Sequence, residues 1–369
     1  MASAKKEKIA IFVSFSGHGG VERMISNLAR GIAAQGYPVD LVLIKSNSPH
    51  LEHLPETVNL VRLGTRHTFA SLFPLIKYLR REKPTVMLAV KDRALKVAVM
   101  AKKFSGYPTT LSARLGTTVS AALEGKSRLR RAMWFGSMRL FYPHVDEIIA
   151  VSQGVADDIS RITRIPANDI NVICNPVITP DIHEKAKADP EHPWLTNKTA
   201  PVIIGVGRLT RQKDFHTLVR AFAKVKEQQD SRLILLGDGG DKASLIQLAE
   251  ELGVRKAIDF AGFVSNPYSY VSRADLFVLS SRWEGSPNVL TEALALGIPV
   301  VSTDCPSGPK EVLQNGQYGP LVEMGDDATL AKKIRSTLAN PLDSATLKQA
   351  VEYYTMEESS RRYLKTMRA

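Results

Sequence analysis

The sequence predicts an α/β protein built from two doubly wound domains, and three features of the chain carry this prediction. Short runs rich in valine and isoleucine alternate with longer stretches of helical periodicity along most of its 369 residues. That alternation is typical of parallel sheets covered by helices on both faces. The length suits two cores of about 150–200 residues better than one. A proline-rich break near the middle of the chain also favours two sheets.

The first domain, residues 1–175, is expected to contain seven strands. These are Ile9–Phe15, Val39–Ile44, Val58–Leu63, Val86–Val90, Thr109–Ser112, Glu147–Val151 and Asn171–Cys174. Helical patterns such as Val21–Gln35 and Gln153–Ile162 separate several of them. The strand–helix–strand order predicts parallel pairing, as in a Rossmann-like domain.

The second domain, residues 176–354, follows the same alternation. Its expected strands are Val202–Val206, Leu233–Leu236, Ile258–Ala261, Leu276–Leu279, Val300–Ser302 and Pro320–Val322, and its helices include Phe215–Gln228, Lys242–Leu252, Val289–Leu296 and Ala328–Leu338. It opens with a linker, residues 176–200, because that stretch is rich in proline and has little apolar periodicity. Two such domains are expected to face each other across a cleft, with ligands at the carboxyl ends of the strands.

Composition excludes several classes of protein. Cys174 and Cys305 are far apart and follow no metal or redox spacing, so a disulfide framework is excluded and a reducing cytoplasm is favoured. No uncharged apolar run approaches the roughly 18–20 residues that span a bilayer. The run Ile9–Val13 is also shorter than the roughly 7–15 residues of a signal-peptide core. We therefore expect a soluble or peripheral cytoplasmic protein.

The net positive charge of the chain comes from its first half. Residues 1–175 carry 25 Lys+Arg against 13 Asp+Glu, while the rest of the chain is neutral, so the whole formal charge of +12 belongs to the first domain. Residues 77–139 alone hold 15 basic residues against Glu82, Asp92 and Glu124. Such an excess predicts an anionic partner: nucleic acid, a membrane surface or a phosphorylated substrate.

Several glycine-rich turns follow predicted strands. Gly205–Arg208 and Gly237–Gly240 do not complete G-x-G-x-x-G, and no P-loop pattern is present, so the dinucleotide and P-loop interpretations fail. The stretch after Gly207 differs because it carries two separated cations, Arg208 and Lys213. A planar guanidinium and a mobile ammonium together suit a diphosphate, although solvated loop charge is the alternative.

A second group of polar residues begins where the predicted strand Leu276–Leu279 ends. Glu284 precedes the turn Gly285–Asn288, which leads into a helix. The free backbone N–H groups of such a turn, with the positive end of the helix dipole, suit a phosphate. Glu284 is placed to accept hydrogen bonds from sugar hydroxyls, and Glu292, one turn into the helix, to reach a ribose diol.

Together these stretches resemble the family 4 retaining glycosyltransferases of the GT-B fold, especially bacterial members that build cell-surface glycans. Glu284 and Glu292 enclose seven residues, as in the E-x7-E pattern of that family. Gly207–Lys213 resembles its G-R-L-x-x-Q-K loop, with Asp214 where many members carry glycine, and Ser16–Arg23 resembles its G-G-x-E-R loop. The resemblance is strong over residues 200–325 and weaker over residues 40–145.

The resemblance implies a role for each matching position. Glu284, Arg208 and Lys213 are implied as catalytic residues, the two cations on the departing diphosphate and the carboxylate on the transferred sugar. Contacts with the donor are implied for Gly19, Gly20, Val264, Gly285, Ser286, Asn288, Val289, Leu290 and Glu292. His18 and Arg114 are expected on the acceptor side. The resemblance implies neither cofactor nor metal, and it implies that residues 355–369 pack back onto the first domain.

The stretch Ser127–Phe141 mixes cations with Trp, Phe and Met at helical spacing. This suits a helix lying in a membrane interface, while an ordinary helix with Trp134 and Phe141 in the core is the alternative. The concentrated charge favours the membrane, since each basic residue near an anionic surface contributes about 1 kcal/mol. We therefore expect a peripheral enzyme on the cytoplasmic face of the inner membrane. It would transfer a sugar from a nucleotide sugar, taken as a UDP-sugar, to a polyprenyl-diphosphate-linked acceptor of a cell-surface glycan.

Three alternatives stay open at this point. A nucleic-acid-binding protein would account for the basic half, but the sequence contains no RRM, KH or helix-turn-helix signature, and we expect no nucleic-acid partner. A nucleotide-sugar epimerase or a phosphorylase would share the fold. A soluble transferase acting on a small molecule would share the donor site and leave the basic patch incidental.

Overall fold

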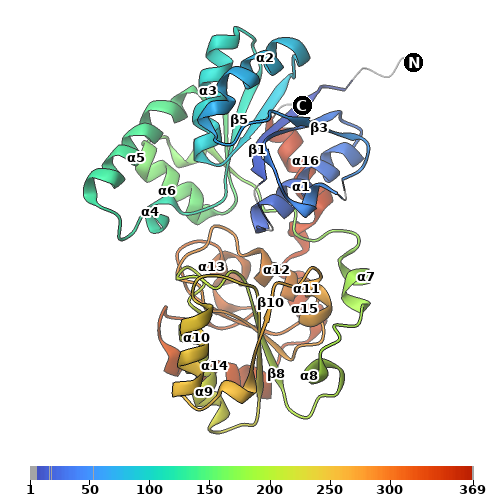
Figure 1. The fold of residues 1–369 in the computed structure, drawn as a ribbon, viewed down its shortest axis with the longest axis vertical. Coiled ribbons are helices and arrows are strands. Elements are labelled where there is room, and N and C mark those ends of the chain that lie inside the picture. The colour runs from blue at the N-terminus through green and yellow to red at the C-terminus, as the bar shows by residue number, and fades with distance from the viewer. Residues whose placement is uncertain (1–5, 16, 18, 53, 368–369) are drawn as a thin grey trace. The chain divides into compact units, whose positions relative to one another are not determined.

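The computed structural model describes residues 6–15, 17, 19–52 and 54–367 of the chain. The chain forms two compact units (Figure 1). The first runs up to Val177 and takes in the C-terminal segment from Tyr353 onward, and the second spans Ile178–Glu352. Each unit holds a wholly parallel sheet within the described residues, which confirms the predicted fold class of two doubly wound α/β domains.

The sheet of the first unit has seven strands in the described part of the chain, in the order β3-β2-β1-β4-β5-β6-β7. The strands are β1 (Ile9–Phe15), β2 (Val39–Ser46), β3 (Val58–Arg62), β4 (Val86–Val90), β5 (Thr110–Leu115), β6 (Glu147–Ala150) and β7 (Ile170–Val172). The order reverses between β1 and β4, which pair directly. Such a reversal leaves a crevice at the carboxyl ends of the two strands.

Helices cover both faces of this sheet. They are α1 (Gly20–Ala34), α2 (Leu72–Glu82), α3 (Asp92–Ser105), α4 (Val119–Ala122), α5 (Arg128–Phe141), α6 (Gln153–Thr163) and α16 (Met356–Met367), with 3-10 turns at Pro49–Leu51, Phe69–Ser71, Tyr142–His144 and Ala167–Asp169. Residues of α2, α3, α5 and α6 share one core with the sheet, and residues of α1 and α16 share the other. Helix α16, drawn in red, lies beside α1 (Figure 1).

The second unit repeats the design with six strands in the described part of the chain, in the order β10-β9-β8-β11-β12-β13. They are β8 (Val202–Val206), β9 (Arg232–Leu236), β10 (Ile258–Gly262), β11 (Leu276–Leu279), β12 (Val300–Thr303) and β13 (Leu321–Val322). The helices are α7 (Ile182–Lys187), α8 (Pro193–Thr196), α9 (Phe215–Lys226), α10 (Lys242–Glu251), α11 (Pro267–Val271), α12 (Asn288–Ala295), α13 (Pro309–Val312), α14 (Asp327–Ala339) and α15 (Ser344–Gln349), with 3-10 turns at Arg255–Ala257, Gln314–Gly316 and Glu352–Tyr354. Here the strand order reverses between β8 and β11.

The structure differs most from the sequence prediction in two places. The stretch interpreted as a linker, residues 176–200, contains the short helices α7 and α8, and Ser272 and Arg273 hydrogen-bond to its backbone. Strand β5 also runs past its predicted end at Ser112, because Ala113 and Arg114 pair with both β4 and β6. No helix in the described ranges is long and apolar enough to cross a membrane.

Candidate functional site

The polar residues of the second unit are brought together by its strand order. The loop that carries Arg208 and Lys213 follows β8, and the loop that carries Glu284 follows β11. These two strands pair directly, with Leu276 opposite Ile203. Because parallel strands end at the same edge of a sheet, both loops emerge side by side at the point where the strand order reverses.

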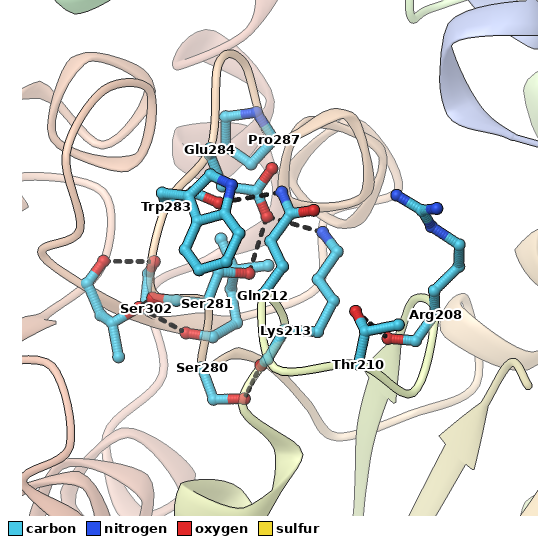
Figure 2. Close-up of polar contacts among 12 residues, drawn as sticks. Arg208, Thr210, Gln212, Lys213, Ser280, Ser281, Trp283, Glu284, Pro287 and Ser302 are labelled. Atoms are coloured by element: carbon cyan, nitrogen blue, oxygen red, sulfur yellow. Dashed lines mark hydrogen bonds and ion pairs between the residues drawn. The ribbon is translucent and has the colours of Figure 1, made fainter. Parts of the chain in front are cut away.

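Lys213 and Glu284 form the centre of this site. The Nζ atom of Lys213 donates a hydrogen bond to Oε1 of Glu284 at 2.6 Å, and the hydroxyl of Ser281 donates to the same oxygen at 2.7 Å (Figure 2). The two charged side chains are only 16% and 8% exposed. A buried ion pair is tolerated when both charges are paired and hydrogen-bonded, and these three groups supply that compensation for each other.

The thiol of Cys305 lies close enough to this pair for both charges to affect its pKa. Burial, together with the negative charge of Glu284, raises the pKa of Cys305 to about 12, against a smaller opposing effect of Lys213. The thiol is therefore protonated, and chemically inert, at neutral pH.

Further hydrogen bonds attach the two loops to each other. The Gln212 side chain donates to the carbonyl of Trp283 at 3.0 Å, and the Ser280 hydroxyl donates to the carbonyl of Lys213 at 2.8 Å (Figure 2). Gly237 and Gly239 let a third loop approach closely. A Cβ at Gly237 would lie 1.9 Å from the carbonyl oxygen of Gly207, so these glycines serve close backbone contact as well as the turn itself.

Arg208 lies on the same loop as Lys213 but is exposed. Figure 2 shows its side chain extending from the loop without a dashed contact to any residue drawn. Its carbonyl accepts a hydrogen bond from the Thr210 hydroxyl. Within the described part of the chain its guanidinium forms no hydrogen bond or ion pair, so it is available to an anion.

The turn before α12 is held by neighbouring backbone. Pro287 occupies the N-cap position of α12, and the carbonyl of Gly285 accepts a hydrogen bond from the Ser307 hydroxyl at 2.9 Å. The hydroxyl of Ser286 is buried and has no hydrogen-bond partner among the described residues. Buried hydroxyls are nearly always hydrogen-bonded, so this one is suited to a contact with a bound ligand.

The other residues of this unit that are predicted to contact the donor differ in their burial. Glu292 is 3% exposed on α12, so it is not a solvated surface glutamate. Leu290 is fully buried in the core and its N–H donates to the carbonyl of Pro287, while Val289 and Val264 are half-buried. The contacts expected of these residues with a donor stay predictions.

Four of the predicted residues belong to the first unit. Gly19 is the N-cap of α1 and Gly20 its first residue, and a Cβ on Gly19 would lie 2.4 Å from the carboxylate of Glu22. Arg114 is 2% exposed in β5, and its guanidinium donates to the Asn175 side chain at 2.6 Å. That guanidinium is engaged within its own unit, so its expected contact with an acceptor stays a prediction. His18 lies outside the described residues.

Several residues of the site were missed by the sequence interpretation. Ser281 bonds Glu284, and the Thr303 hydroxyl donates in turn to the carbonyl of Ser281 at 2.7 Å. Ser307 and Cys305 follow β12, the strand beside β11. The rule that polar residues at adjacent strand ends meet would have indicated this third loop, since β12 was already a predicted strand.

Two family models match the chain, one on each half. Residues 18–179 match the model described as "Glycosyltransferase Family 4", and residues 188–354 match "Glycosyl transferases group 1".

Relatives and a solved structure cover nearly the whole chain. The N-acetylgalactosamine-N,N'-diacetylbacillosaminyl-diphospho-undecaprenol 4-alpha-N-acetylgalactosaminyltransferase of Campylobacter jejuni is 28% identical over 348 residues, 90% of each chain. The lipopolysaccharide core biosynthesis glycosyltransferase LpsE of Rhizobium meliloti is also 28% identical, over 88% of this chain and 87% of its own. The crystal structure of Anabaena Alr3699/HepE in complex with UDP and glucose superposes with a TM-score of 0.78 at 19% identity, covering 98% of this chain and 99% of that one.

Proposed function

Because this chain belongs to the family 4 glycosyltransferases and has their GT-B fold, we propose that it transfers a sugar from a UDP-sugar to a lipid-linked sugar acceptor, with retention of anomeric configuration. One observation carries the donor side of this proposal. It is the buried Lys213–Glu284 pair at the strand-order reversal of the second unit. The Anabaena structure, which holds UDP and glucose, supports the class of donor.

The site residues divide the chemistry of transfer between them. Lys213 and the exposed Arg208 offset the charge that builds on the diphosphate as its bond to the sugar breaks, which is the largest kind of catalytic effect in such reactions. Glu284 accepts hydrogen bonds from hydroxyls of the transferred sugar. The buried Ser286 hydroxyl and the start of α12 offer hydrogen bonds to phosphate oxygens.

A thermal-shift screen of nucleotide sugars tests the donor. A UDP-sugar at 100 times its Kd is expected to stabilise the protein by about 2.7 kcal/mol, whereas GDP- and ADP-sugars produce smaller shifts. Lys213→Met is expected to lose the shift. As the matched control, Lys224→Met removes the ion pair between Lys224 on α9 and Asp327 on α14 and is expected to keep the shift. Failure of every UDP-sugar to raise Tm would refute the proposed donor, and product NMR showing an inverted anomer would refute retention.

The acceptor side of the proposal rests on a surface of the first unit. Leu129, Met133 and Leu140 are 73%, 67% and 64% exposed on α5. At about 100° per residue these three side chains fall within roughly 40° of one another on the helix. Arg128 and Arg130 lie on either side of this exposed apolar stripe. Apolar residues flanked by cations suit a helix lying in an anionic membrane surface.

The aromatic residues of α5 have a different role from the one expected at the membrane. Trp134 and Phe141 pack against the core of the first unit, as in the ordinary-helix alternative. The indole of Trp134 is further held by Arg93 and Lys96, 5.5 and 5.1 Å from its centroid. The exposed stripe therefore consists of aliphatic side chains and Met133, and it is these that we propose contact lipid.

This surface and one relative support the proposed acceptor class. The Campylobacter jejuni relative is named for a diphospho-undecaprenol acceptor, and a membrane-bound acceptor requires an enzyme that reaches the bilayer. We place this protein on the cytoplasmic face of the inner membrane, in the synthesis of a cell-surface glycan such as a polysaccharide or O-antigen.

Vesicle sedimentation tests the membrane contact. Vesicles containing phosphatidylglycerol are expected to bind the protein, and binding falls with salt because surface charges are screened. Substituting Leu129 and Met133 together by serine is expected to reduce binding at least fivefold. Leu342→Ser, at an exposed leucine of the second unit, should leave it unchanged. Equal binding to neutral and anionic vesicles at all salt concentrations would refute the electrostatic part.

A further inference from the structure

Asp214 directly follows Lys213 and adopts an unusual backbone conformation. Its φ and ψ are 46° and 47°, in the left-handed region that favours glycine. Many members of the resembled family carry glycine at this position, so the conformation itself does not require aspartate. A side chain in this region is disfavoured, and Asp214 is also 4% exposed. Its carboxylate therefore needs compensating contacts.

One contact of that carboxylate is with the loop after β11. Its Oδ2 atom accepts a hydrogen bond from the Thr217 hydroxyl at 2.9 Å and lies 3.0 Å from Nε of Arg282. Asp214 occupies the N-cap position of α9 but makes no side-chain cap hydrogen bond. The carboxylate therefore contacts a side chain in the first turn of α9 and Arg282 in the loop after β11, and it caps no backbone N–H of the helix.

Arg282 binds the Lys213 loop on both sides of the lysine. Its backbone N–H donates to the carbonyl of Gln212 at 2.8 Å, and its guanidinium pairs with Asp214. Arg282 stands two residues before Glu284, whose carboxylate accepts from Lys213 at 2.6 Å. One arginine thus connects the residues before and after Lys213 to the loop that presents Glu284.

The Lys213–Glu284 bond itself cannot hold the loops during turnover. A bound donor requires the lysine to turn to the diphosphate and the carboxylate to turn to sugar hydroxyls, which breaks the bond between them. The contact between Asp214 and Arg282 involves neither of these groups, so the exchange does not require it to break.

We propose that Asp214 and Arg282 form a positioning pair. The pair keeps the loop after β8 and the loop after β11, together the donor loops, at a fixed spacing while Lys213 and Glu284 exchange their mutual bond for bonds to the donor. This inference rests on the proposed donor site. It adds a contact that a glycine at position 214 would not make. Neither residue of the pair is proposed to touch the reacting atoms.

Binding and kinetics of a double-mutant cycle test the pair in the full chain. Asp214→Gly keeps the backbone conformation and is expected to leave Tm close to that of the wild type. We expect Asp214→Gly and Arg282→Gln each to weaken binding of the UDP-sugar selected by the thermal-shift screen about fivefold to tenfold by titration calorimetry. The double variant should be no weaker than either single one, since both remove the same contact.

Kinetics and conservative variants separate positioning from a purely structural effect. The KM for the donor is expected to rise in both single variants with a smaller change in kcat. Arg282→Lys is expected to restore part of the affinity, and Lys224→Met should change nothing. If the wild type binds the donor and the variants bind it within twofold, or if their effects simply multiply, the pair is refuted and the donor site stands. If the wild type binds no UDP-sugar, the proposed function fails and the pair's role fails with it.

Discussion

The Lys213–Glu284 pair allows stability and catalysis to be tested separately. The perturbation is the cycle of Lys213→Met, Glu284→Gln and the double variant. Removing one partner of a fully buried ion pair costs about 3–5 kcal/mol. Here the side chains are 16% and 8% exposed, so water reaches the remaining charge in part, and we expect about 2 kcal/mol for Lys213→Met. Glu284→Gln keeps an acceptor for Lys213 and Ser281 and should cost about 1 kcal/mol.

The double variant should be more stable than the sum of the two losses implies. With both charges gone, no unpaired charge stays buried, so we expect a total loss of about 1 kcal/mol rather than about 3. In a domain of this size about 1 kcal/mol corresponds to roughly 2–4 °C in Tm. Thermal unfolding of the four proteins by calorimetry therefore resolves the difference.

Activity should not follow stability in this cycle. Removing one group that stabilises developing charge lowers kcat by about 10²–10³, so Lys213→Met is expected to be nearly inactive. The double variant should stay inactive although its stability is largely recovered. Additive Tm losses would refute the coupling of the pair, and a kcat for Lys213→Met within tenfold of the wild type would refute its role at the diphosphate.

Two further outcomes follow from the loop after β12. Gly308→Ala is expected to lower Tm and weaken donor binding more than tenfold, because its φ is +94° and a Cβ would lie 2.5 Å from Pro287. Gly316→Ala is the control, since its φ is +96° but open space surrounds the Cβ. Equal effects of the two variants would show that only the backbone conformation matters. Cys305 is expected to resist thiol reagents at pH 8 in the native protein, because burial raises its pKa to about 12, while the half-buried Cys174 reacts first. Because the folded pKa of Cys305 lies above the ordinary thiol value of 9.0, its stabilising contribution is complete below pH 9 and is lost as the pH rises toward 12. Two thiols reacting at one rate at pH 8, or a Cys305→Ala protein with an unchanged alkaline unfolding curve, would contradict this.

The fold was predictable because its signals are local. Each of the thirteen predicted strands is present in the described residues, with ends shifted by a few residues, since continuous apolar runs between turn residues are characteristic of buried parallel strands. A strand end differs from its predicted position where pairing with neighbouring strands, rather than the apolar run in the sequence, sets the length of the strand. Arg114 is the clearest case, since a charged residue reads as a strand end but is buried here between β4 and β6.

The donor loops were predictable in part. Arg208, Lys213 and Glu284 stood out by residue type and by the resemblance of their motifs. Ser281, Thr303 and Cys305 did not, because a serine or cysteine near a strand end is common in any α/β protein. Their contribution depends on hydrogen bonds between strands that lie far apart in the sequence. The exposed apolar stripe of α5 was not identified, because helical periodicity does not tell which face of a helix is buried.

By itself the sequence determined the fold class, the two-domain plan, the placement of net charge and the family. These properties depend on composition and on patterns within a few tens of residues. Only the tertiary structure decided that Lys213 and Glu284 bond each other, that Asp214 reaches Arg282, and that Leu129 rather than Trp134 faces outward on α5. Those facts depend on which strands are neighbours and which helix face meets the sheet, and packing between distant segments sets both.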